Sequence, residues 1–222
     1  MILVAFALPE EAAPFKKQIR SHPVLARNLR VIVGGMGAGL TRRNVLPLIK
    51  ELRPDLVLTC GFAGGLKPGL KTGEVVFVAT PGDPSVVGLQ KNDAQPGSIL
   101  TVETVAATSI AKKMLREKTG ADAVEMESGI IQAFCKAESI RVLTVRVISD
   151  SFDEDLPLDF SKMLRADDTL DPLKLAWAIA CHPGKIPSLL KLQSQLKICA
   201  ATLSMVLVGL LENELRQCLP AR

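Results

Sequence analysis

The stretch LVLTCGFAGGLKPGLKTGEVVFV, residues 56–78, decides the fold of this chain. Two apolar runs, residues 56–59 and 74–79, flank a glycine-rich segment that carries few charged side chains. Short runs rich in Val, Leu and Ile, apolar on both faces, are typical of buried strands in a sheet covered by helices. The stretch therefore predicts two buried strands joined by a glycine bend.

Similar runs recur along the chain and alternate with segments of helical period. The further predicted strands are residues 2–7, 29–33 and 142–148, and the predicted helices include residues 40–52, 105–118 and 126–137. Residues 81–96 are polar and contain Gly and Pro, which predicts a surface loop or hairpin. Strands alternating with helices indicate an α/β fold whose central mixed sheet is flanked by helices. We expect one domain over residues 1–222, with a helical C-terminal tail at about residues 172–217.

Composition argues against several classes of protein. Hydrophobic residues make up 48% of the chain and charged residues 23%, which is typical of a globular protein with a substantial core. The net charge is only +4, and seven Phe, one Trp and no Tyr are present, so we expect no nucleic-acid partner. The five cysteines form no C-x-x-C pair and no Cys/His metal spacing. We therefore expect buried thiols in a reducing cytoplasm, and neither a metal nor a cofactor.

The two ends of the chain are apolar for different reasons. The N-terminal MILVAFALPEE lacks the positive segment of a signal peptide and predicts a buried first strand. Residues 198–211 are all uncharged, but this run is shorter than the roughly 18 residues expected of a membrane span. We expect a helix that is buried in the protein or at an interface, with a peripheral membrane contact as the second alternative.

Polar residues and glycines follow the predicted strands, at the positions where ligands bind in α/β sheets. These candidates are Glu11, the cluster at residues 34–39, the bend at residues 61–65, Glu125 with Glu127, and Ser149 with Asp150. Each has a simpler explanation, because glycines form turns and carboxylates favour helix N-termini. The cluster at residues 34–39 precedes a helix, so its amides are candidates for binding an anion or a hydroxyl. Arg146 lies inside an apolar strand and needs a partner, because an unpaired buried charge is costly.

Five motifs carry a resemblance to a known family. In order, they are ALPEE, GGMGAG, CGFAGGL with KTGEVV, AVEMES and RVISD. They resemble the purine nucleoside phosphorylase and methylthioadenosine/adenosylhomocysteine nucleosidase superfamily from Met1 to about Asp150. The resemblance implies a three-layer nucleoside phosphorylase-like fold and an oligomeric enzyme that cleaves the N-glycosidic bond of a purine nucleoside. The later segment HPGKIPSLLKL resembles, more narrowly, the hopanoid-associated phosphorylase branch.

The resemblance also assigns roles to residues. Asp150 matches the general acid that protonates the purine at N7, Glu11 the glutamate that activates water, and Glu127 the carboxylate that binds ribose hydroxyls. Met126 matches the residue that packs under the sugar, and Arg146 the strand arginine near the nucleophile. The other residues expected at the substrate are Gly35, Gly37, Gly61, Phe62, Ala63, Val105, Glu125 and Ser149. These roles suit an oxocarbenium-like transition state, which needs a neutralised leaving group and stabilised charge on the ribose.

Four departures from the family pattern bear on the reaction. Phe62 stands where relatives carry Ser or Thr, and Thr59 stands where some phosphorylases supply a phosphate-binding arginine. Water is therefore favoured as the nucleophile, although Arg146, the glycine amides or a neighbouring subunit remain alternative ways to bind phosphate. Val105 replaces a stacking aromatic, and residues 81–96 are shorter than the family's connection. Both departures imply an open pocket, compatible with a bulky 5′ substituent such as the chain of adenosylhopane.

Two readings from other classes compete with a nucleosidase. A weak binding protein would keep the pocket and lack the nucleophile anchor, but it has no need of Glu11 opposite Asp150. A dinucleotide-binding Rossmann enzyme requires fingerprint glycines and an acidic residue about 20 positions further on, and the chain lacks this pattern. A nucleoside-cleaving enzyme is the preferred interpretation.

Overall fold

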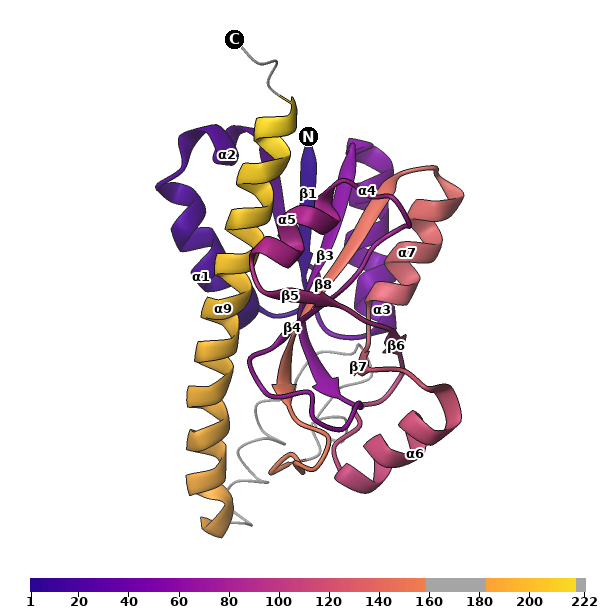
Figure 1. Ribbon diagram of the computed structural model, residues 1–222, viewed down its shortest axis with the longest axis vertical. Helices are drawn as coiled ribbons and strands as arrows, with labels where there is room; N and C mark the ends of the chain where they lie inside the picture. Colours follow the sequence, from indigo (N-terminus) through magenta and orange to yellow (C-terminus); the bar gives the residue numbers. More distant parts are fainter. Residues whose placement is uncertain (159–182, 219–222) are drawn as a thin grey trace.

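The computed structural model describes residues 1–158 and 183–218, with side chains in the second range as far as Glu214. An eight-stranded sheet lies at the centre, and helices cover both of its faces (Figure 1). The strands are β1 (Ile2–Phe6), β2 (Leu29–Val33), β3 (Leu56–Gly65), β4 (Val75–Val78), β5 (Ala94–Pro96), β6 (Ile99–Thr101), β7 (Ala123–Glu125) and β8 (Arg141–Asp150). This architecture confirms the predicted α/β fold with a central mixed sheet.

The sheet is parallel at its centre and mixed toward one edge. Its main path is β2-β1-β3-β8-β4-β5, and β7 pairs with both β3 and β6. Strands β2, β1, β3 and β8 run parallel, so that Leu56 of β3 lies opposite Ile2 on one side and Arg141 on the other. Strand β4 is antiparallel to β8. The predicted bounds of β1, β2, β4 and β8 agree with the structure to within two residues at each end.

Strand β3 is longer than the sequence predicts. The expected bend at residues 61–65 is part of the strand, because these residues pair with β8 and, at Gly64 and Gly65, with β7. The reversal of the chain comes later, at residues 66–74. Glycine is required within the strand because its neighbours approach closely: a Cβ on Gly61 would lie 2.7 Å from Oε1 of Glu11.

Ten helical segments are described. They are α1 (Pro9–Arg20), α2 (Pro23–Asn28), α3 (Ala38–Leu40), the π-helical η1 (Thr41–Val45), α4 (Leu46–Leu52), α5 (Ser85–Lys91), α6 (Ser109–Thr119), α7 (Ser128–Ala137), the 3₁₀ turn η3 (Pro183–Lys185) and α9 (Ile186–Cys218). Two predicted helices begin later than expected. Helix α6 begins after Thr108, whose side chain accepts a hydrogen bond from the Ala111 N–H at 3.2 Å. The capped start leaves Val105 in the preceding loop.

The prediction of a loop or hairpin for residues 81–96 is wrong. This segment contains α5 and β5, and β5 pairs in parallel with β4. The glycine at position 88 suggested a turn, but it allows close packing: a Cβ there would lie 3.3 Å from the side chain of Asn213 in α9. Leu89 of α5 is fully buried in the same contact region.

Helix α9 runs alongside α1 and α5 and packs one face against the sheet (Figure 1). Buried apolar residues of this face are Cys199, Leu203, Val206, Leu207, Leu210 and Leu211. The predicted burial is therefore confirmed for this face, whereas Met205 is 58% exposed. By length and composition Pro183–Glu214 is apolar enough to cross a membrane, and half of its most apolar window is buried. The core helix of a globular protein meets the same criterion, so the membrane contact stays a prediction. Residues 172–182 of the expected helical tail lie outside the described residues.

Candidate active site

The carboxyl ends of β1, β3 and β8 meet at one edge of the sheet and border a cavity of about 410 Å³. The predicted site residues that line it are Glu11, Phe62, Ala63, Val105, Glu125, Met126, Glu127, Ser149 and Asp150. They come from α1, the end of β3, the loop before α6, the β7–α7 junction and the end of β8. Segments far apart in the sequence thus converge where an α/β sheet usually binds its ligand.

Glu11 lies in the first turn of α1, and three backbone amides hold its carboxylate. Oε2 accepts hydrogen bonds from the N–H groups of Ala7 at 3.0 Å and Leu8 at 2.8 Å. Oε1 accepts one from the N–H of Phe62 at 2.8 Å, which ties α1 to β3. Burial raises the pKa of Glu11 above its usual value, while these amides and Arg146 oppose the shift.

Arg146 lies within β8, and its guanidinium has the partner that a buried charge requires. Its Nη2 forms an ion pair with Oε2 of Glu125 at 2.6 Å and donates to the hydroxyl of Thr59 at 3.1 Å. Oε2 of Glu127 lies 3.9 Å from the same nitrogen. Nε and Nη1 have no hydrogen-bond partner among the residues that the structure describes. The predicted need for a partner is confirmed for one edge of the guanidinium.

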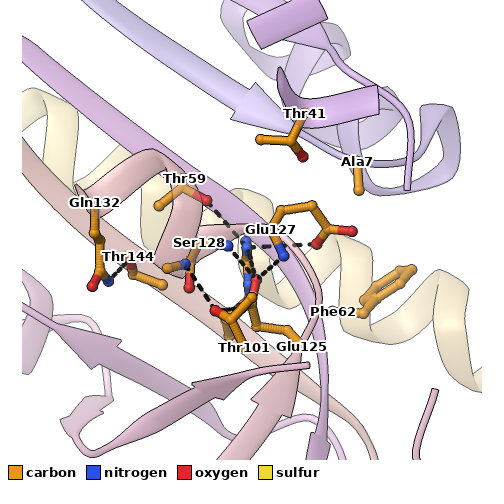
Figure 2. Close-up of polar contacts among 12 residues, drawn as sticks. Ala7, Thr41, Thr59, Phe62, Thr101, Glu125, Glu127, Ser128, Gln132 and Thr144 are labelled. Carbon is orange, nitrogen blue, oxygen red and sulfur yellow. Dashed lines mark hydrogen bonds and ion pairs between the residues drawn. The ribbon is translucent and has the colours of Figure 1, made fainter. Parts of the chain in front are cut away.

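Glu125 fixes the start of α7. Its Oε2 accepts hydrogen bonds from the N–H groups of Glu127 at 3.0 Å and Ser128 at 2.8 Å, and its Oε1 accepts one from the Thr101 hydroxyl at 2.5 Å (Figure 2). Burial acts to raise the pKa of Glu125, but Arg146 and Thr101 outweigh it, so this pKa lies below its usual value. The simpler explanation offered by the sequence, a carboxylate at a helix N-terminus, therefore applies to Glu125.

Glu127 is the residue that immediately precedes α7. Its side chain lines the cavity and also bonds to the backbone. Its Oε1 accepts a hydrogen bond from the N–H of Gly37 at 2.7 Å. Burial and the neighbouring Glu125 raise the pKa of Glu127 to about 7, against the opposing effects of Arg146 and the Gly37 amide. Glu127 therefore changes charge near neutral pH while lining the cavity.

A second cavity of about 10 Å³ shares Ala7 and Glu127 with the first. Its polar lining consists of Thr41, Thr59, Cys60, Glu127 and Arg146. The volume corresponds to about one water molecule. Residues of η1, β3 and β8 thus surround a polar space beside the guanidinium that is much smaller than a phosphate ion.

The amides of Gly34, Gly35 and Gly37 are not free, so the prediction of free amides is wrong at these three glycines. The N–H of Gly35 donates to the carbonyl oxygen of Ala7 at 3.1 Å, and the N–H of Gly37 donates to Glu127. Gly35 lines the small cavity, whereas Gly37 and Gly61 line neither cavity. A carboxylate of the protein already occupies the position that the Gly37 amide was expected to give to a ligand.

Asp150 ends β8, and both of its carboxylate oxygens have partners. Oδ1 accepts a hydrogen bond from the hydroxyl of Ser149 at 2.5 Å, and Oδ2 lies 2.5 Å from Nζ of Lys112. Burial raises the pKa of Asp150 above its usual value, while Lys112 and Ser149 act in the opposite direction. A buried carboxyl group with a raised pKa has the property that a proton donor near neutral pH requires.

Sequence reasoning missed two parts of this site. The first part is Lys112, which the sequence does not distinguish from the other basic residues of α6. The signal that could have found it is its spacing, four residues after Thr108 and three before Leu115, which places it on the same face of the helix as these two residues. The second part is an apolar wall formed by Met36, Val102, Leu156, Leu192 and Leu196. The contribution of α9 to this wall was not visible in the sequence, because apolar residues on a helix look the same whether they meet a core or a ligand.

The fold and the carboxylates around one cavity define a class of enzyme that cleaves N-glycosidic bonds, the nucleosidases and nucleoside phosphorylases. The chain belongs to the phosphorylase superfamily, whose family profile matches residues 2–81 and 77–169. The resemblance inferred from the motifs is thereby confirmed. A Rossmann dinucleotide enzyme is not the class to which this chain belongs.

Relatives of known activity are similar over most of the chain. A 5′-methylthioadenosine/S-adenosylhomocysteine nucleosidase of an Exiguobacterium strain is 26% identical over 188 residues, covering 68% of this chain and 80% of the relative. The corresponding nucleosidase of Actinobacillus succinogenes is 28% identical over 174 residues, covering 64% of this chain and 76% of the relative. The similarity extends through most of each relative rather than through an isolated motif.

Solved structures share the fold at low sequence identity. Futalosine hydrolase of Helicobacter pylori is 14% identical, with a TM-score of 0.67 over 96% of this chain and 97% of that chain. The methylthioadenosine/adenosylhomocysteine nucleosidase of Neisseria meningitidis, in complex with methylthio-immucillin-A, is 16% identical, with a TM-score of 0.67 over 96% and 98% of the two chains. At these identities the likeness bears on the fold.

Proposed function

We propose that this protein hydrolyses the N-glycosidic bond of a purine nucleoside, with adenine as the base and a substituent at the 5′ position. The observation that carries the proposal is the placement of Glu11, Glu127 and Asp150 along one cavity at the carboxyl ends of the strands. The names of the relatives support it, since those similar in sequence are nucleosidases and a structural neighbour is a hydrolase.

Each carboxyl group has a separate part in the proposed reaction. Asp150 donates its proton to N7 of the purine while the C1′–N9 bond breaks and its electron pair moves onto the base. Glu127 accepts hydrogen bonds from the ribose hydroxyls and stabilises the positive charge that develops on the sugar. Glu11 takes a proton from the water whose oxygen bonds to C1′. The products are the free base and the free sugar.

The polar space beside Arg146 favours water over phosphate. Its volume of about 10 Å³ suits a single water molecule, and Thr59 accepts a hydrogen bond from the guanidinium in place of a phosphate. The side chain of Phe62 supplies no hydroxyl, and its amide is used by Glu11. A phosphorylase, including one that processes adenosylhopane, is the alternative and requires this space to enlarge.

The apolar wall supports a hydrophobic group at the 5′ position. Leu156, Leu192 and Leu196 lie on the side of the cavity that α9 covers. Leu156 and Leu192 also line an adjoining hollow of about 460 Å³, to which Ser188, Lys191 and Gln195 of α9 contribute as well. A 5′ substituent larger than a methylthio group therefore has room to extend. Comparing methylthioadenosine with a 5′-alkyl adenosine tests this: better use of the small substrate contradicts it.

Phosphate dependence is the direct test of the reaction. We expect turnover of a 5′-substituted adenosine in phosphate-free buffer, with adenine and the free sugar as products and no rate increase on adding phosphate. The measurement is adenine release followed by chromatography of the sugar product. Turnover that requires phosphate and yields a sugar 1-phosphate overturns the hydrolase proposal in favour of the phosphorylase.

Asp150→Asn separates an enzyme from a binding protein. The amide cannot donate a carboxyl proton, so we expect the turnover number to fall by about 10²- to 10⁴-fold, while nucleoside binding measured by calorimetry persists. A wild-type protein that binds purine nucleosides without cleaving them supports the binding-protein alternative. We also propose that the protein acts in the cytoplasm, as its cysteines suggest: the free, buried thiols of Cys60, Cys135 and Cys199 suit a reducing compartment. The family resemblance supports the further proposal that it is a homo-oligomer.

A further inference from the structure

The ammonium group of Lys112 is the most completely buried charge near the cavity that the proposed reaction does not use. Lys112 lies in α6, and its side chain is 0% exposed. Its Nζ is 2.5 Å from Oδ2 of Asp150 and donates to the carbonyl oxygens of Ser151 and Glu154, each at 2.7 Å. An ammonium group has three N–H donors, so all three have acceptors.

A merely structural role does not account for this arrangement. Residues 151–156 are already bound to α6 and to the loop before it: the Ser109 N–H donates to Asp155 at 2.6 Å, and the Leu156 N–H donates to Ala107 at 2.8 Å. Burying a charge without a function is costly, and an apolar side chain of the same length usually serves packing better. The adjacent Lys113 is exposed, as is usual for lysine on a helix.

We propose that Lys112 is a positioning residue for Asp150: it fixes Oδ2 and stabilises the carboxylate that remains once the proton has been given to the leaving purine. The inference rests on the proposed function, in which Asp150 is the proton donor. In that step the O–H bond of Asp150 breaks, the N7–H bond forms, and the electron pair stays on a carboxylate that faces an ammonium ion. Lys112 itself neither gains nor loses a proton.

The groups around Asp150 explain why one cation has a large influence. Ser149 donates to Oδ1 from the same strand, and Lys112 faces Oδ2 from α6. From the loop after β8, the carboxylate of Glu154 adds negative charge. From α9 come the thiol of Cys199, whose raised pKa keeps it neutral, and the amide of Gln195, which donates to the Ser149 carbonyl and to Glu154. Among the main influences on the pKa of Asp150, Lys112 is the one cation, and it opposes the rise that burial causes.

The proposal is tested by Lys112→Met, with Lys113→Met as the matched control on the same helix. Removing the cation is expected to raise the pKa of Asp150 by about 1 to 3 units. The turnover number should fall by about 10- to 100-fold, while the alkaline limb of its pH profile moves upward by the same number of units. Activity that is lower but persists to higher pH is not expected of a structural defect. Lys113→Met should retain the wild-type profile.

A readout that does not need turnover keeps this inference separate from the proposed reaction. Carbon-13 labelling of aspartate carboxyl groups, with the Asp150 signal assigned through Asp150→Asn, reports its titration directly. An unchanged titration in folded Lys112→Met overturns the pairing, even if the activity falls. Wild-type protein without turnover overturns the proposed function instead, while a shifted titration still supports the pairing.

Two further variants guard against misfolding. Lys112→Gln keeps N–H donors for the Ser151 and Glu154 carbonyls but removes the charge, so it should show the same shift as Lys112→Met. In the Asp150→Asn background, adding Lys112→Met should cost no further activity, because Lys112 acts through Asp150. A large additional loss in the double variant contradicts the proposal.

Discussion

At the scale of residues, one guanidinium serves three carboxyl groups. Arg146 contacts Glu125 at 2.6 Å and lies 3.9 Å from Glu127, and it also influences Glu11. One buried positive charge cannot stabilise three negative charges equally. Glu125, which is in direct contact, has a lowered pKa, whereas Glu11 and Glu127 have raised values. The cluster thereby contains one carboxyl group that loses its proton more readily than usual and two that hold theirs more readily.

Glu127 gives this cluster a pH dependence. Its pKa is raised to about 7, so falling pH converts the carboxylate to the acid and removes an acceptor for ribose hydroxyls. We expect nucleoside affinity to weaken as the pH drops through about 7. Calorimetry on the Asp150→Asn variant, which should bind without turnover, measures this affinity from acidic to alkaline pH.

Glu127→Gln in the Asp150→Asn background is the control for this titration. It should weaken binding by about 10- to 100-fold at alkaline pH, the usual effect of losing a hydrogen bond to a charged group. It should also abolish the dependence near pH 7. An affinity that stays constant across neutrality in the parent variant contradicts the assignment of Glu127 to the ribose.

Some residues of the site could be predicted from the sequence, and others could not. Glu11, Glu127 and Asp150 were identifiable because their motifs lie at strand ends, where side chains must converge. The pairing of Lys112 with Asp150 was not identifiable, because helical spacing shows at most that Lys112 faces inward, and only the tertiary structure brings α6 to the end of β8. The Gly37 amide was misassigned, because its acceptor Glu127 lies 90 residues away in sequence.

At the scale of elements, the glycines of residues 61–65 belong to strand β3 and do not form a bend. Because Gly61 has no side chain, the carboxylate of Glu11 can approach the strand, and a Cβ there would lie 2.7 Å from Oε1. We predict that Gly61→Ala displaces Glu11 and lowers the turnover number by about 10²-fold, the cost typical of a 1 Å misplacement. Steady-state kinetics and a urea unfolding curve measure the two effects.

Gly184→Ala is the matched control for this substitution. No atom of the described residues lies within 4 Å of the Cβ position at Gly184, so the same chemical change should leave the turnover number unaltered. Equal activity of Gly61→Ala and the wild-type protein would show that Glu11 needs no such clearance, and would count against its proposed role.

The elements themselves follow the sequence wherever local and tertiary preferences agree. Strands β1 and β2 were predicted because their apolar runs favour a strand whichever neighbours they pair with, although in β2 only Leu29 is fully buried. Helix α5 was missed, because Pro84 and Gly88 signal a turn locally while packing against α9 stabilises a helix. Helix α7 begins at Ser128 rather than Met126, since the carboxylate of Glu125 caps its first amides.

At the scale of the whole molecule, α9 contributes much of the core on one face of the sheet. Leu203 is 0% exposed within the largest apolar cluster, whereas Met205 on the same helix is 58% exposed. Leu203→Ala should therefore lower the free energy of unfolding by about 2 to 5 kcal/mol. Met205→Ala should change it by no more than about 0.5 kcal/mol.

Urea unfolding of both variants distinguishes a core helix from one that covers another surface. Similar small effects at both positions would show that α9 contributes little to the core. A large effect at Met205 would instead indicate that its exposed face is covered in solution, as the predicted oligomer or a peripheral membrane contact requires.

Because α9 both lines the cavity and fills the core, ligand binding is coupled to the stability of the fold. Leu192 and Leu196 touch the cavity, and Leu203 and Leu207, further along the same helix, fill the core. A ligand resting on the first pair restrains a helix on which the packing of the whole domain depends. Ligand that binds only the folded state at about 100 times its dissociation constant adds about 2.7 kcal/mol of stability. Candidate nucleosides can thus be ranked by the rise in melting temperature that each one causes, before any product is known.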